Sequence, residues 1–160
     1  MSPVDGAAVD ASAESKVYFE RLDDPDRIEG IARLLLRRGR LTPHVLILCP
    51  DAGSMAKLDE RLWTIDPESF LAHGVAGGNT QENSEHPILL ALDICRDNQP
   101  GVLINGTCEV PPELDGFSSI VDFVDAWSEP LMQASRERFR SYRQMGMNPQ
   151  YLAAAAKKAN

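Results

Sequence analysis

The order of apolar and polar residues predicts short strands that alternate with helices. Residues 16–22 (KVYFERL) alternate between apolar and polar side chains and include aromatic and β-branched residues, which is typical of a strand. Runs such as residues 44–50 (HVLILCP) are largely apolar, as expected of strands that are buried on both faces of a parallel sheet. Strands are predicted on this basis at residues 44–50, 69–74, 87–93, 101–107 and 118–124.

Three segments between or after these runs carry helix signals. Residues 24–39 and 51–63 have apolar residues three or four positions apart, which predicts one buried helix face in each. Residues 130–146 begin with Pro130, which suits the first turn of a helix. Residues 75–87 are polar and rich in glycine, and we expect a loop there. Strands that alternate with helices predict one three-layer α/β domain with a mostly parallel sheet.

The two ends of the 160-residue chain differ in composition from the predicted domain, which we place at residues 16–149. Residues 1–15 are small and polar with no apolar stretch, so we expect a disordered tail and no secretory signal. Residues 150–160 are rich in alanine and predict a helix-prone or frayed tail. No apolar run is long enough to cross a bilayer, so we expect no membrane partner.

The three cysteines are odd in number and widely spaced, which argues against a disulfide framework, and no CxxC pair exists. This usage favours free thiols in a reducing cytoplasm. The three histidines lack metal-ligand spacing with the cysteines, so we expect no metal site.

The charge of the chain is unevenly distributed. The formal net charge is −8, yet residues 131–160 hold six basic residues and one acid, a local charge of +5 that leaves −13 on the other 130 residues. An acidic body repels a phosphate backbone, so we expect no strong direct nucleic-acid binding. A small basic patch on an acidic body favours a short acidic ligand instead.

The basic patch is centred on RERFRSYR, residues 136–143. On a helix, Arg136, Phe139, Arg140 and Arg143 share one face, with Met132 one turn earlier. Guanidinium groups bind carboxylates in bidentate pairs, and a neighbouring ring can receive an apolar side chain. The spacing equally fits a solvated helix face near the negative end of the helix dipole, with the phenylalanine in the core.

The other ring of this helix, Tyr142, points away from the stripe. We expect it to face the core with its hydroxyl near the rim.

Motifs of nucleotide-binding and hydrolytic enzymes are absent from the sequence. It contains no Walker A loop, no GxGxxG turn and no GxSxG elbow. His44 and Cys49 are five positions apart in a predicted strand, hence on opposite faces, which argues against a catalytic dyad. We expect no catalytic residues and no cofactor. A nucleotide-binding α/β enzyme and a direct single-stranded DNA binder remain as alternatives.

Trp63 and Phe70 lie near the end of the second predicted helix and just after it. Large rings at the ends of elements are either core plugs or interface anchors, and position alone favours the core.

Two blocks in this order carry a resemblance to a known family. They are LDERLW with the following Ser69–Phe70 pair, and the pattern RxRxxxYRxxG at residues 136–146. With these blocks, residues 16–149 resemble the chi subunit of bacterial DNA polymerase III. The resemblance implies a non-catalytic Rossmann-like domain that serves as an accessory subunit of the clamp-loader complex. It further implies two partners: a psi-like subunit, and the acidic, phenylalanine-ended tail of single-stranded DNA-binding protein.

By position, the resemblance assigns the tail-binding role to Arg136, Phe139 and Arg140, flanked by Val124. Phe139 stands where the family often has tyrosine, and Met132 stands where a lysine can precede the motif. One hydroxyl and one basic contact are therefore missing from this chain, while the apolar wall remains.

Trp63 and Phe70 match the aromatic positions that the family uses toward psi and, in some members, toward a competing repair helicase.

Overall fold

The fold is a three-layer α/β/α sandwich built on one parallel sheet. We describe it from a computed structural model, in which residues 15–38, 44–69 and 71–152 are placed. Within these residues the sheet has seven strands, all parallel, in the order β3-β4-β2-β5-β6-β1-β7. Their bounds are β1 Lys16–Leu22, β2 Val45–Leu48, β3 Gly74–Val75, β4 Ile88–Ala91, β5 Val102–Asn105, β6 Ser119–Asp125 and β7 Asn148–Tyr151. The predicted three-layer fold with a parallel sheet is confirmed.

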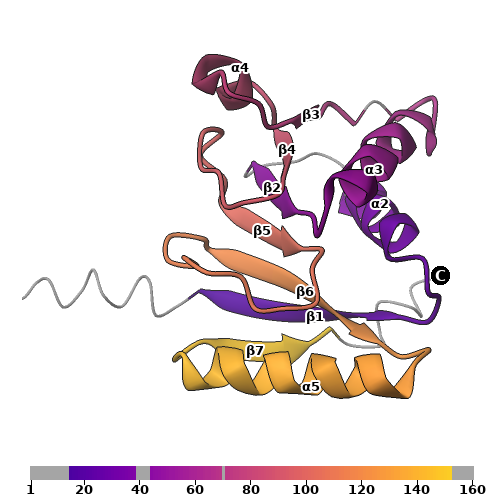
Figure 1. Ribbon diagram of the computed structural model, residues 1–160, viewed down its shortest axis with the longest axis vertical. Coiled ribbons are helices and arrows are strands. Elements are labelled where there is room, and N and C mark those ends of the chain that lie inside the picture. Colours follow the sequence, from indigo (N-terminus) through magenta and orange to yellow (C-terminus); the bar gives the residue numbers. More distant parts are fainter. Residues whose placement is uncertain (1–14, 39–43, 70, 153–160) are drawn as a thin grey trace, which may run out of the picture.

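Four helices of the described chain surround this sheet: α2 Arg27–Arg38, α3 Ala52–Thr64, α4 Thr80–Ser84 and α5 Glu129–Gln144. Figure 1 shows α2 and α3 packed together, with α5 by itself beside β7 on the other side of the molecule. The inner strands of the sheet alternate their side chains between two separate cores, as pleating requires. In β2, Val45 and Ile47 face the core of α2 and α3, whereas Leu46 and Leu48 face the core of α5.

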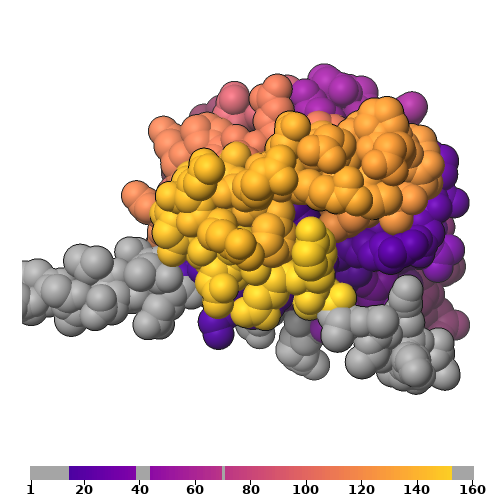
Figure 2. All heavy atoms as spheres, turned by 90° about the horizontal axis from the view of Figure 1, so that it is seen from below, coloured from indigo at the N-terminus to yellow at the C-terminus, as the bar shows by residue number. Residues whose placement is uncertain are grey.

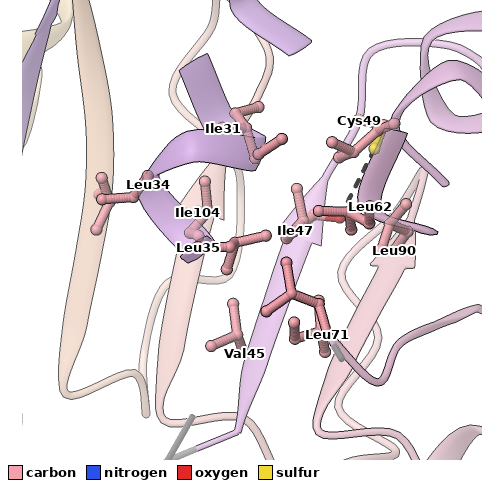
Figure 3. Close-up of a cluster of buried hydrophobic side chains, with 14 of the residues drawn as sticks. Ile31, Leu34, Leu35, Val45, Ile47, Cys49, Leu62, Leu71, Leu90 and Ile104 are labelled. Atoms are coloured by element: carbon pink, nitrogen blue, oxygen red, sulfur yellow. Dashed lines mark hydrogen bonds between the residues drawn. The ribbon is translucent and has the colours of Figure 1, made fainter. Parts of the chain in front are cut away.

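The core beneath α2 and α3 explains the helical spacing of apolar residues in the first half of the chain. Figure 3 shows Ile31 and Leu35 of α2 and Leu62 of α3 directed toward Ile47 and Ile104 in the sheet. All five side chains are almost completely buried. Burying each one stabilises the fold by about 1.5–3 kcal/mol relative to exposure.

The predicted boundaries differ from the structure at both edges of the sheet. Of the strand predicted at residues 69–74, only Gly74 is confirmed among the described residues, because β3 is a two-residue edge strand, Gly74–Val75. The predicted loop at residues 75–87 contains the short helix α4, which Asn79 caps by accepting a hydrogen bond from the Glu82 amide.

The inner end of each predicted tail belongs to the folded domain. Ser15 is buried, and its hydroxyl donates a hydrogen bond to the Phe117 carbonyl oxygen at 2.6 Å, so it does not belong to a tail. Gln150 and Tyr151 lie in β7, paired with Tyr18 and Phe19 of β1. The expectations for residues 1–14 and 153–160 fall outside the described residues.

Candidate functional site

Helix α5 begins and ends at clear signals. The Ser128 hydroxyl accepts a hydrogen bond from the Leu131 amide, and Pro130 occupies the first turn, where its missing N–H costs nothing. Beyond the last turn Gly146 has φ +91°, a left-handed conformation that glycine adopts without strain. These signals set where the helix begins and where it ends.

The sheet-facing side of α5 carries a buried polar network that the sequence did not predict. Arg138 is 4% exposed and pairs with the fully buried Asp122 of β6 at 3.2 Å. Its guanidinium also donates to the backbone carbonyls of Cys108 and Phe123. Asn105 of β5 donates to the same Asp122 carboxylate at 3.0 Å. The network therefore joins α5 to β5, β6 and the loop after β5.

Tyr142 completes this network. Its ring is fully buried, and its hydroxyl donates to Asp122 Oδ2 at 2.8 Å. The expectation that this hydroxyl lies near the rim is wrong, because the hydroxyl reaches the buried Asp122 carboxylate inside the core. Burial, reinforced by the nearby Asp122 charge, raises the pKa of Tyr142 above its usual range.

The outward side of α5 brings the predicted arginines together. Arg136, Arg140 and Arg143 are all exposed. Arg136 donates to the Gln133 side chain at 3.1 Å and lies 3.7 Å from the exposed Glu129 carboxylate. Within the described part of the chain Arg140 forms no hydrogen bond or ion pair. Surface pairs such as the one to Glu129 contribute little, so the stripe remains cationic.

Phe139 lies between the two sides of the helix, half-buried, in a cluster of aromatic rings. It contacts Phe19 of β1 at a ring-centroid distance of 5.3 Å and stacks on Tyr151 of β7 at 4.8 Å with an interplanar angle of 13°. The Arg143 guanidinium lies 5.3 Å above the Phe139 ring. Because Tyr151 is 55% exposed, the stack continues to the surface beside the arginines. Figure 2 shows this face, with α5 and β7 side by side.

Sequence reasoning missed Tyr151 as a member of this site. It follows Pro149, a residue that usually ends regular structure, and lies at the start of the alanine-rich end. What places Tyr151 in the site is the register of β7 on β1, which pairs Tyr151 with Phe19 and is visible only in the structure.

Of the other two residues assigned to this face, Met132 lies beside the stripe and Val124 packs against the core beneath it. Met132 is half-buried, with its sulfur 3.4 Å from Arg136 Nη2. Val124 of β6 is half-buried against the core beneath α5.

Trp63 occupies a different surface, near the end of α3. Its side chain is 51% exposed, which contradicts a core position. Its ring contacts the buried His73 ring at a centroid distance of 4.4 Å. Phe70 falls outside the described residues.

The carboxyl ends of β2 and β5, where α/β proteins often bind nucleotides, border only a small cavity. The cavity there has a volume of about 60 Å³ and is lined by Cys49, Pro50 and Gly106 among others, whereas ligand pockets typically measure about 300–1,000 Å³. The Asp51 carboxylate accepts a hydrogen bond from the Ser54 amide at 2.7 Å, so it already caps the start of α3. This edge therefore lacks a cavity of the size that a nucleotide usually occupies.

A reactive thiol, a metal site and a membrane-spanning helix each place their own requirements on the described residues. Burial raises the pKa of the Cys49 thiol from 9.0 to about 12, which makes it a poor nucleophile. No group of three His, Cys, Asp or Glu side chains in this part of the chain could hold a metal ion. None of the helices described is long and apolar enough to cross a membrane.

Comparison with known proteins gives consistent similarities. The family model described as "DNA polymerase III chi subunit, HolC" matches residues 15–150. The DNA polymerase III subunit chi of Pseudomonas aeruginosa is 34% identical over 125 residues, which cover 78% of this chain and 84% of that protein. The subunit chi of Escherichia coli is 30% identical over 138 residues, which cover 81% and 92% respectively.

Among solved structures, T4 UvsW aligns with a TM-score of 0.57 at 8% identity. It covers 87% of this chain and 41% of that protein, and the likeness concerns the fold alone.

Proposed function

This chain belongs to the family of DNA polymerase III chi subunits, which are accessory subunits in DNA replication. From this premise we propose that it is a non-catalytic adaptor. In this proposal it links a psi-like subunit of the clamp loader to the acidic C-terminal tail of single-stranded DNA-binding protein. The tail binds to α5, and psi binds near Trp63.

The observation that carries the tail-binding role is the outward side of α5. Arg136, Arg140 and Arg143 are exposed beside the Phe139–Tyr151 stack, on a chain whose net charge is −8. Carboxylates of an acidic tail, including the terminal one, pair with guanidinium groups, while a terminal phenylalanine packs against the rings. The two kinds of contact lie next to each other, as a short acidic peptide with an apolar end requires.

The psi-binding role rests on the exposure of Trp63. An indole that is 51% exposed near the end of a helix is the kind of anchor that dominates protein interfaces. In some family members the same surface is used by a repair helicase, which would then compete with psi. Because α3 and α5 cover opposite faces of the sheet, the two partners are able to bind at the same time.

The test is a titration of a fluorescent acidic peptide that ends in phenylalanine. We expect Arg140→Ala to weaken binding about tenfold, which corresponds to loss of about 1.4 kcal/mol from a charge-assisted contact. Arg38→Ala is the matched control, because it removes the same charge from the exposed end of α2, in the opposite layer. Equal losses in both variants would show that only net charge matters, and no loss in Arg140→Ala would reject the site.

Two further measurements address the alternative functions. Saturable thermal stabilisation by nucleotides would revive a nucleotide-binding enzyme. Retention of single-stranded DNA by the purified chain at moderate salt would favour direct binding through arginine and aromatic stacking.

A further inference from the structure

His73 is a buried histidine with acceptors at both ring nitrogens. It is 5% exposed and lies in the segment between α3 and β3. Its Nδ1 is 2.7 Å from the Leu71 carbonyl oxygen. Its Nε2 is 2.9 Å from Asp59 Oδ1 and 3.1 Å from the Asp59 carbonyl oxygen. The imidazole is therefore held from both sides by oxygen atoms.

This arrangement constrains the protons on the ring. A neutral imidazole carries one N–H, so one of its nitrogens would direct a lone pair at an oxygen. Only the imidazolium donates a hydrogen bond on both sides. The Asp59 carboxylate, whose Oδ1 lies 2.9 Å from Nε2, would balance the positive charge of that imidazolium.

Trp63 lies against this ring from the next turn of α3. Asp59 and Trp63 are four positions apart, so both side chains lie on one side of the helix. The centroid of the Trp63 ring is 4.4 Å from that of His73, within the range of about 6 Å at which a cation attracts an aromatic face. The exposed indole therefore lies against a buried ring that has oxygen partners on both sides.

We propose that His73, held as an imidazolium between Leu71 and Asp59, is a positioning residue that fixes the Trp63 indole for docking of the partner subunit. The docking part rests on the proposed function, whereas the state of the imidazole does not. The pair also ties the segment before β3 to α3 across 14 positions of the chain. Trp63 is next to the last residue of α3, where a helix frays unless such contacts hold it.

The first test is ¹⁵N NMR of the imidazole groups in the isolated full-length chain, near pH 7.5, about where an unperturbed histidine is mostly neutral. We expect both ring nitrogens of His73 to carry protons, and we expect Asp59→Asn to lower the doubly protonated fraction. A neutral His73 with one bare nitrogen in the wild type would overturn the proposal. The measurement needs no partner, so it is independent of the proposed function.

The second test measures affinity for a purified psi-like subunit of the holoenzyme. We expect His73→Gln and Asp59→Asn each to weaken this binding about three- to tenfold, while the acidic peptide binds as in the wild type. His44→Gln is the matched control, because among the described residues His44 has a carbonyl partner at Nδ1 and none at Nε2. The Asp59 side chain is 37% exposed, so Asp59→Asn should fold even if His73→Gln does not, and the test can then be made with Asp59→Asn alone.

The outcomes separate the two proposals. If Trp63→Ala weakens psi binding and neither His73→Gln nor Asp59→Asn does, the positioning role is wrong. If Trp63→Ala itself leaves psi binding unchanged, the docking surface of the proposed function is wrong, and the positioning role falls with it.

Discussion

The two sides of α5 place the same residue type, arginine, in opposite environments, one buried and paired and the other exposed. Arg138 is 4% exposed and locked into a network with Asp122, whereas Arg140, two positions later, is exposed and forms no ion pair within the described chain. Removing one partner of a buried pair leaves an uncompensated charge, whereas an exposed arginine costs almost nothing to lose. One arginine of the four therefore fixes the helix, and the other three remain exposed.

The buried side of α5 also determines how its exposed side is presented. Asp122 of β6 accepts hydrogen bonds from Arg138, Tyr142 and Asn105, which sets the rotation of α5 on the sheet. That rotation directs Arg136, Arg140 and Arg143 outward together. A helix held only by apolar contacts would be less strictly constrained, because hydrophobic contacts are not directional.

The largest predicted effect is on the buried side. Arg138→Ala leaves Asp122 buried without its counter-ion, and we expect the free energy of unfolding to fall by about 3–5 kcal/mol. Urea denaturation measures this change. The matched variant Arg140→Ala should stay within about 0.5 kcal/mol of the wild type. Adding Asp122→Asn to Arg138→Ala should recover part of the loss, and no recovery would mean that packing rather than charge dominates.

Tyr142→Phe should have a smaller effect of the same kind. It removes one hydrogen bond to a buried carboxylate, so we expect a loss of about 1.5–3 kcal/mol in unfolding free energy. The wild type should also lose stability above about pH 10, because the unfolded chain then ionises its tyrosine while the folded chain, with its raised pKa, does not.

The phenylalanine variant lacks that contribution, so the stability difference between the two proteins should shrink as the pH rises further. A constant difference would argue against a buried, neutral tyrosine.

On the exposed side, we expect salt to weaken peptide binding while leaving the buried network intact. Raising the ionic strength shortens the screening length to about 8 Å at 0.15 M, so the affinity for the acidic peptide should fall steadily. Over the same range the unfolding free energy should change little. Binding that does not respond to salt would mean that the rings, not the arginines, carry the affinity.

The smallest predicted effect concerns Tyr151. Tyr151→Ala removes the outer ring of the stack on Phe139, and we expect peptide binding to weaken by about 0.5–1.5 kcal/mol. The loss should be seen with a peptide ending in phenylalanine and vanish with one ending in alanine. An equal loss for both peptides would place Tyr151 outside the apolar wall.

The core of the fold was predictable because its signals are local. Alternation in β1, the apolar runs of β2, β4 and β5, and the helical spacing in α2 follow from which side chains must leave water. The edge strands β3 and β7 were not predictable in this way. Gly74–Val75 and Asn148–Tyr151 are too short or too polar to show a pattern, and they become strands only because a neighbour supplies hydrogen bonds.

For the site, the sequence by itself determined that one helix carries four arginines and two rings on an acidic chain. Tertiary structure decided which of these remain available. Arg138 is satisfied by Asp122, 16 positions away on β6, and Phe139 is extended to the surface by Tyr151 on β7. Periodicity along a helix predicts which residues share a side, but the charge or ring that each side meets comes from distant strands.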